Sequence, residues 1–149
     1  MKAIDIQDPR VLLLLQAIGA PYAWGSGDLG NARQLWPDGP FDCSGFAQAC
    51  LVALGMVRPR AWNDLSARGL ADACDSVELE EARIGDLAFY GSGVTHVTVC
   101  IGAGMTIGAN GGGSKTNADD PRARVQIRPI VYRNDLVTVG RLKAKFTLE

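Results

Sequence analysis

The stretch "GPFDCSGFAQAC", residues 39–50, predicts the start of a helix and holds two of the chain's four cysteines. Asp42 is a residue type that caps helix N-termini, and the pattern ends at Gly55, a typical helix stop. Between them, apolar residues recur at helical spacing, at Phe46, Ala47, Cys50, Leu51 and Leu54. This spacing predicts one apolar stripe that contains Cys50, while Cys43 lies in the first helical turn.

Helices are expected around this stretch in the first half of the chain, and strands in the second half. One helix is expected to begin at Asp8-Pro9 and to end with Gly19 as its C-cap, and a weaker one to begin at Asn63. From Ile84 the apolar period changes to two, in runs separated by glycines: GDLAFYG (85–91), HVTVCIG (96–102), MTIGANG (105–111), RVQIRPIVYR (124–133) and LVTVGRL (136–142). The pattern predicts an α+β fold, with N-terminal helices on one face of a central antiparallel β-sheet arranged as a meander.

The length and charge of the chain limit its class. The 149 residues suffice for one domain, expected over residues 1–147, and residues 148–149 are set aside as a cloning remnant. A net charge of −1 without a basic run argues against nucleic acid as a partner. No run reaches the roughly 18 apolar residues that span a bilayer, so no membrane partner is expected. The apolar segment 11–23 resembles a secretory signal, but acidic residues precede it, so it is expected to stay as a helix in a protein that is cytoplasmic at synthesis.

Three of the cysteines are expected to have no chemical role. With no export signal, all four are expected to be reduced thiols. Cys50 and Cys100 lie in apolar surroundings typical of core residues, and Cys74 has no informative neighbours. No pair has C-x-x-C spacing and the chain has one histidine, so neither a metal nor another cofactor is expected.

Cys43 differs from the other three cysteines. In the first helical turn, unpaired backbone N–H groups and the positive end of the helix dipole favour a thiolate, and small neighbours leave room for a substrate carbonyl. A thiolate nucleophile usually needs an imidazole, and the single histidine, His96, opens a predicted strand after a glycine turn. The alternatives are an incidental cysteine and a structural histidine, but their joint presence favours a nucleophile and its base.

With these residues identified, the chain resembles the NlpC/P60 family of papain-like cysteine peptidases, which cleave the peptide part of bacterial cell walls. Three blocks carry the resemblance: PYAWGS (21–26), FDCSGF (41–46) and RIGDLAFYGSGVTHVTVCIGAG (83–104). The most specific feature is D-C-S-G-F at a helix start, followed by G-D-L and then by a strand-initiating histidine. The resemblance implies the papain-like NlpC/P60 fold.

The resemblance also implies roles for individual residues. Cys43 corresponds to the nucleophile, and His96 to the base that takes the thiol proton and later protonates the leaving amine. The implied reaction is hydrolysis of the bond from γ-D-glutamate to a diamino acid in a peptidoglycan stem peptide that begins with L-Ala. The amide of Cys43 is expected in the oxyanion hole. Whether the diamino acid is diaminopimelate or lysine stays open. The residues expected to bind the substrate are Tyr22, Trp24, Asp42 and Ser44.

One position departs from the family pattern. The resemblance places the residue that orients the imidazole at position 108, which is a glycine and cannot orient a ring. Asn110 has the same side-chain parity on the predicted strand, so it is expected to supply an amide from the same face. The alternative is that Asn110 only begins an Asn-Gly turn.

Two other functions stay open besides the peptidase. An acyl transferase of the papain-like superfamily would keep the thiol and change the acceptor. A catalytically silent phage-tail or wall-binding module would keep only the fold. The segments 108–113 and 130–142 look similar to cell-wall peptidases of phage and prophage origin, which predicts delivery to the wall or periplasm by a phage tail or a secretion apparatus.

Overall fold

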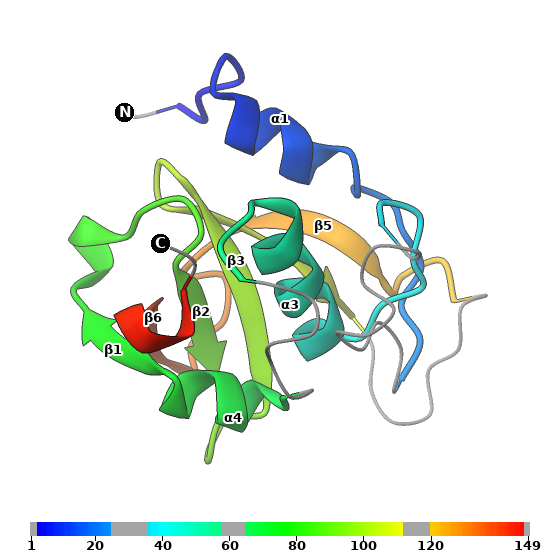
Figure 1. The fold of residues 1–149 in the computed structure, drawn as a ribbon. Coiled ribbons are helices and arrows are strands. Elements are labelled where there is room, and N and C mark those ends of the chain that lie inside the picture. Colours follow the sequence, from blue (N-terminus) through cyan, green and yellow to red (C-terminus); the bar gives the residue numbers. More distant parts are fainter. Residues whose placement is uncertain (1–2, 25–35, 58–64, 112–119, 148–149) are drawn as a thin grey trace.

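The computed structural model describes residues 3–24, 36–57, 65–111 and 120–147 (Figure 1). Its helices are α1 (Pro9–Leu15), α3 (Cys43–Ala53) and α4 (Ala67–Asp72), with the short 3-10 helices η2 (Leu79–Glu81) and η3 (Ala144–Phe146). Its strands are β1 (Cys74–Val77), β2 (Leu87–Tyr90), β3 (His96–Gly102), β4 (Met105–Asn110), β5 (Arg124–Pro129) and β6 (Leu136–Leu142). None of the described helices is long and apolar enough to cross a membrane.

The strands form one six-stranded antiparallel sheet in the order β1-β6-β2-β3-β4-β5. Strands β2 to β5 follow one another as the predicted meander. The last strand departs from it, because the chain leaves β5 at one edge, crosses the sheet and inserts β6 between β1 and β2. The sequence analysis placed no strand before Ile84, and β1 corrects this. Its CDSV sequence has no apolar alternation, and it is held by pairing with β6.

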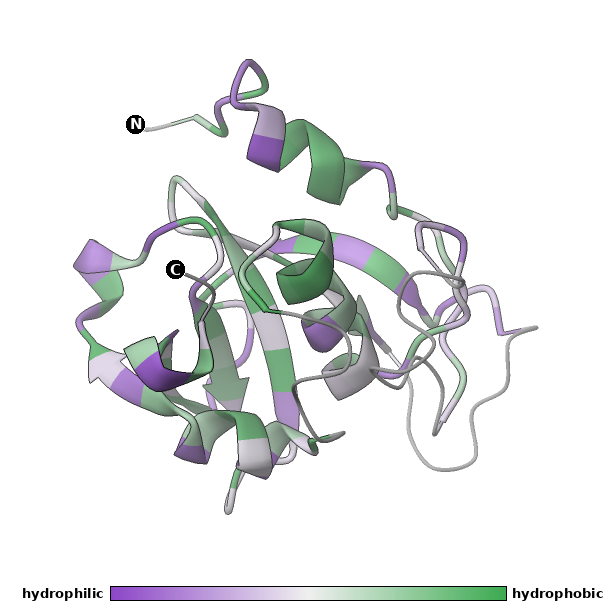
Figure 2. Ribbon diagram, in the orientation of Figure 1, coloured by the Kyte–Doolittle hydropathy of each residue, from purple (hydrophilic) through white to green (hydrophobic). Residues whose placement is uncertain are grey.

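Helices α3 and α4 cover one face of the sheet, as predicted, and α3 packs on β3 and β4 (Figure 1). The core beneath α3 includes Val97 and Val99 of β3 and Ile107 of β4. Residues 45–51 of α3 are all buried, so the helix is enclosed on every side instead of along a single apolar stripe. Apolar residues accordingly dominate much of α3 and the second half of α1 in Figure 2. Cys50 lies in this core, as predicted.

The opposite face of the sheet carries a smaller apolar cluster that includes Tyr90, Cys100 and Ile130. The segment that crosses from β5 to β6, residues 130–135, contacts this face. The Tyr90 hydroxyl donates to the carbonyl oxygen of Ile130 at 2.7 Å, and the ring of Tyr132 packs edge-on against Tyr90 with 5.3 Å between centroids. The crossing segment therefore forms a second layer on the side of β2 and β3 away from α3.

Helix α1 begins as predicted and ends earlier than predicted. The side chain of Asp8 accepts a hydrogen bond from the N–H of Arg10, with Pro9 in the first turn. The α-helical pattern stops at Leu15 with Gln16 as the C-cap, and not at Gly19, because bonds to the third residue back continue the chain as tighter turns. Gly19 follows these turns at φ 88°, a conformation that glycine adopts without strain.

Helix α4 begins later than the sequence pattern indicates. The side chain of Ser66 accepts a hydrogen bond from the N–H of Gly69, which fixes the start at Ala67. The predicted start, Asn63, lies outside the described residues. Cys74, expected near the end of this helix, is instead the first residue of β1.

Candidate active site

Cys43 is the first residue of α3, and its thiol lies against β3. Asp42 caps the helix, and its Oδ1 accepts a hydrogen bond from the N–H of Gly45 at 2.7 Å. The backbone N–H groups of Val97, Ser44 and Cys43 itself each lower the pKa of the thiol, that of Val97 the most. The capped helix start therefore brings the thiol to the residue that directly follows His96.

The sheet opens where the thiol contacts it. β3 and β4 pair only between residues 99–102 and 105–107, although β3 stays paired with β2 as far as His96. Along a strand, backbone N–H groups point alternately to the two neighbouring strands. The N–H of Cys100 donates to the carbonyl oxygen of Asp86, on the β2 side. Val97 is an odd number of residues away from Cys100, so its N–H points to the β4 side. With no ladder partner there, this N–H is available to the sulfur. The divergence of β3 and β4 thus leaves the N–H of Val97 able to lower the pKa of the Cys43 thiol.

His96 is the first residue of β3, and its ring is held from one side. Its Nε2 lies 2.9 Å from Oδ1 of Asn110, the last residue of β4. A carbonyl oxygen only accepts hydrogen bonds, so Nε2 carries the proton and Nδ1 presents a lone pair. The neutral ring is therefore held in the tautomer that can accept a proton at Nδ1.

Gly108, the position that the family pattern indicates for the orienting residue, has no space for a side chain. A Cβ at this position would lie 2.4 Å from Cγ2 and 3.0 Å from Cβ of Thr98. Thr98 is fully buried, and its hydroxyl accepts a hydrogen bond from the hydroxyl of Thr106, so its side chain is not free to move aside. Thr98 therefore fills the space that a residue at 108 would use, and the amide beside His96 comes from Asn110.

Burial dominates the ionisation of both groups. It raises the pKa of the Cys43 thiol, which the N–H of Val97 partly offsets and the charge of Asp42 increases further. Burial lowers the pKa of His96 to about 4, against the opposing effect of its hydrogen bond to Asn110. The thiol and imidazole are therefore both neutral near pH 7. This state suits proton transfer during attack on a substrate, not a preformed ion pair.

We expect buried His96 to make the folded protein lose stability in acid. Its pKa is about 4 in the folded chain, against 6.5 for a free imidazole, so between these values the unfolded chain binds more protons. The free energy of unfolding should therefore rise with pH through this window, and about 3 kcal/mol should be lost between pH 7 and about pH 4. Denaturant titrations of the wild type and of His96→Gln at several pH values measure the contribution of His96, because all other groups contribute equally to the pH dependence of both proteins. Equal pH slopes in the two proteins would contradict it.

Three of the four predicted substrate-binding residues lie at the thiol. Tyr22 is 2% exposed, and its backbone forms an isolated β-bridge with Phe41. Burial raises the pKa of its hydroxyl, and the nearby charges of Cys43 and Asp42 raise it further. Asp42 and Ser44 flank Cys43 in the sequence and are partly buried. Trp24 is 61% exposed, so its ring lies at the surface. The structure thus brings Tyr22, Asp42 and Ser44 together at the thiol.

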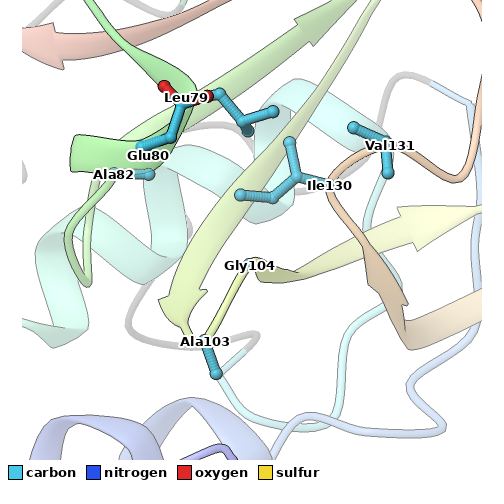
Figure 3. Close-up of a pocket in the computed structure, with 7 residues that line it drawn as sticks. All are labelled: Leu79, Glu80, Ala82, Ala103, Gly104, Ile130 and Val131. Carbon is cyan, nitrogen blue, oxygen red and sulfur yellow. The ribbon is translucent and has the colours of Figure 1, made fainter. Parts of the chain in front are cut away.

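Two other kinds of site offer no competing chemistry. A pocket of about 380 Å³ is drawn in Figure 3, and it is lined by Leu79, Glu80, Ala82, Ala103, Gly104, Ile130 and Val131. It lies at the end of β3 opposite to His96, and Glu80 is the one titratable side chain of this lining. Among the described residues, no group of three or more His, Cys, Asp or Glu side chains is arranged to hold a metal ion.

The sequence analysis missed the residues behind Asn110. The Tyr132 hydroxyl donates to Oδ1 of Asn110 at 3.2 Å. Arg133 lies over the ring of Tyr90 at 5.4 Å and forms an ion pair with Asp135 at 2.6 Å. These residues belong to the segment that crosses the sheet before β6. No local pattern could have identified them, because their position depends on where β6 inserts.

Comparison with known proteins gives matches along most of the chain. The NlpC/P60 family model matches residues 19–131. Peptidoglycan endopeptidase RipB of Mycobacterium tuberculosis is 33% identical over 121 residues, which cover 78% of this chain and 48% of RipB. The bifunctional muramidase/DL-endopeptidase CwlT of Bacillus subtilis is 29% identical over 146 residues, which cover 95% of this chain and 38% of CwlT. The chain thus spans about half of RipB and less of CwlT.

A solved structure confirms the predicted fold. RipD of Mycobacterium tuberculosis superposes with a TM-score of 0.62 at 22% identity, over 94% of this chain and 98% of that chain. RipD is described as a non-catalytic NlpC/p60 domain protein adapted to a peptidoglycan-binding function. At this identity the likeness shows the fold alone, which is the α+β, papain-like arrangement predicted above.

Proposed function

The chain belongs to the NlpC/P60 family, and from this premise we propose that it is a cysteine peptidase that hydrolyses peptidoglycan stem peptides. One observation carries the proposal. The Cys43 thiol lies against the residue after His96, and Asn110 holds His96 with its Nδ1 lone pair available. A nucleophile beside a base that a third group orients is the arrangement that thiol catalysis requires.

The geometry supports a sequence of proton transfers. As the Cys43 sulfur attacks the peptide carbonyl carbon, its proton passes to Nδ1 of His96, and the N–H of Cys43 at the helix start donates to the developing oxyanion. The imidazolium is stabilised by Oδ1 of Asn110 and then protonates the leaving amine. Water, activated by the neutral imidazole, hydrolyses the thioester and restores the free thiol.

We assign cleavage to the bond between γ-D-glutamate and the diamino acid, next to an N-terminal L-Ala. The Asp42 carboxylate, adjacent to the nucleophile, supplies the negative charge that a free α-amino group needs, and Tyr22 lies beside it. The DL-endopeptidase activity in the name of CwlT also supports this bond.

Incubation with synthetic L-Ala-γ-D-Glu-meso-diaminopimelate, followed by mass spectrometry, tests the function. We expect the dipeptide L-Ala-γ-D-Glu and free diaminopimelate as products. Release of free L-Ala would contradict the assigned bond, and tripeptides left intact with meso-diaminopimelate and with L-lysine at the third position would together contradict the peptidase. Addition of an amine acceptor distinguishes an acyl transferase, which would form a new amide in place of the free acid.

Replacing Asp42 with asparagine should weaken binding of the free amino end. Asparagine also caps helices, so the start of α3 should be preserved while the charge is lost. We expect KM for the tripeptide to rise about tenfold, in line with the loss of one partly exposed charge contact, with kcat changed much less. The N-acetylated tripeptide is the matched control, because both proteins should cleave it equally poorly. A rise in KM of equal size for both substrates would instead indicate a damaged helix start.

Peptidoglycan binding without turnover is a second candidate function. RipD has the same fold and is described as non-catalytic, and position 108 of this chain lacks the side chain that the family pattern predicts. Binding of the tripeptide by the wild type with no cleavage would favour this function. Delivery to the wall or periplasm by a phage tail or a secretion apparatus stays a prediction that rests on segments 108–113 and 130–142 alone.

A further inference from the structure

Next to Asn110 lie polar side chains that the mechanism above does not use. Tyr132 donates to Oδ1 of Asn110, which contacts the imidazole, and the next residue, Arg133, pairs with Asp135. We propose that Tyr132 and Arg133 are positioning residues that fix the tautomer of His96 by fixing the orientation of the Asn110 amide. The effect of this role on rate rests on the proposed peptidase function, whereas its effect on the tautomer does not.

The orientation of Asn110 determines which nitrogen of His96 carries the proton. An asparagine amide has an accepting oxygen at one end and a donating nitrogen at the other, with nearly the same shape. With Oδ1 toward His96, Nε2 is protonated and Nδ1 accepts. With Nδ2 toward His96, Nε2 would accept, the proton would lie on Nδ1, and the ring could not take the proton of Cys43.

The surroundings of Asn110 do not favour the observed orientation by themselves. Asn110 is 5% exposed, and its Nδ2 is buried with no hydrogen-bond partner among the described residues. An unpaired buried donor is unfavourable, so a compensating interaction must hold Oδ1 toward the ring. Oδ1 accepts from two groups at once, Nε2 of His96 at 2.9 Å and the Tyr132 hydroxyl at 3.2 Å.

Arg133 determines the direction of the Tyr132 hydrogen bond. A tyrosine hydroxyl can donate or accept, so Tyr132 alone would tolerate either end of the amide. The Arg133 guanidinium carries a positive charge and donors only, and it lies over the ring of Tyr90, against which Tyr132 packs edge-on. A positive charge on this side of Tyr132 favours the orientation in which the hydroxyl proton points away from it and toward Asn110, as observed. That proton requires an acceptor, which is Oδ1.

Arg133 is itself fixed in place. It forms two hydrogen bonds to the Asp135 carboxylate, at 2.8 and 2.6 Å. Its guanidinium also lies over the ring of Tyr90, which packs against His96 on one side and Tyr132 on the other, with centroids 5.7 and 5.3 Å apart. A positive charge fixed beside Tyr132 thus favours one direction for the hydrogen bonds from Tyr132 through Asn110 to Nε2.

Nuclear magnetic resonance of ¹⁵N-histidine-labelled protein tests the proposal directly, because the chain has one histidine. At pH 7 we expect the wild type to show Nε2 protonated and Nδ1 unprotonated. Tyr132→Phe keeps the ring and removes the hydroxyl. It should show a mixture of both tautomers and a kcat about tenfold lower at unchanged KM, the loss expected for one hydrogen bond.

Arg133→Met should shift the tautomer in the same direction, because the Tyr132 hydroxyl then becomes free to accept from Nδ2. Arg10→Met is the matched control, since Arg10 also pairs with an aspartate two residues away but lies on α1, and it should leave the His96 spectrum unchanged. A wild type protonated on Nδ1 would overturn the proposal without any variant. The proposal would also be overturned if Tyr132→Phe and Arg133→Met both kept the tautomer of the wild type. An inactive wild type whose tautomer shifts in these variants would support this inference and contradict the peptidase function.

Discussion

Replacing Cys43 with alanine is expected to abolish release of L-Ala-γ-D-Glu from the stem tripeptide. The alanine side chain has no nucleophilic atom, so kcat should fall by about 10⁴-fold or more, as when a catalytic triad loses its nucleophile. Product quantification by mass spectrometry under single-turnover conditions, with enzyme in excess, can follow a loss of this size. Binding of the substrate should persist, because the contacts proposed for its amino end remain.

Cys74→Ala is the matched control for this variant. Cys74 is the other partly buried cysteine, but it lies at the start of β1, and burial raises the pKa of its thiol to about 12. We expect its removal to leave kcat and KM unchanged. Product release by Cys43→Ala at a rate near that of the wild type would contradict the assignment of Cys43 as nucleophile.

Replacing Asn110 with alanine is expected to lower kcat by about 10²-fold while changing KM little. The variant removes the acceptor that holds Nε2–H and stabilises the imidazolium, and a hydrogen bond to a charged group contributes about 2–3 kcal/mol. The tautomer of His96 should become mixed in the same protein. Full activity in Asn110→Ala would show that the imidazole needs no partner on β4.

Moving the amide to position 108 provides a sharp control. Gly108→Asn combined with Asn110→Ala places it where the family pattern expects it, yet we expect no recovery, because Thr98 occupies that space. Adding Thr98→Gly to this protein should restore part of the lost kcat. Recovery in the double variant with Thr98 intact would contradict the steric explanation.

Features of the site that depend on neighbours in the sequence could be predicted. Asp42 caps the helix in which Cys43 is the first residue, and both facts follow from local propensity. His96 begins a strand because a glycine turn precedes an alternating apolar run. Positions 108 and 110 are two residues apart on one strand, so their side chains were expected on the same face. Asn110 contacts His96 because it lies on that face.

Features that depend on distant pairing could not be predicted. β1 has no apolar alternation and exists because β6 pairs with it. Tyr132 reaches Asn110 because the chain crosses the sheet to insert that same strand, and the linear pattern contains no signal for this crossing. The conflict between Thr98 and a side chain at 108 likewise arises only when β3 and β4 are packed side by side.

The rate of Cys43 alkylation at pH 7, measured in the wild type and in His96→Ala, tests most directly whether these two residues act as nucleophile and base. An L-Ala-γ-D-Glu chloromethyl ketone would serve as the probe, and intact mass followed by peptide mapping would locate the adduct. We expect a single adduct, on Cys43, that forms about 10²-fold faster in the wild type than in His96→Ala. Equal rates in the two proteins, or an adduct on another of the four cysteines, would contradict the assignment.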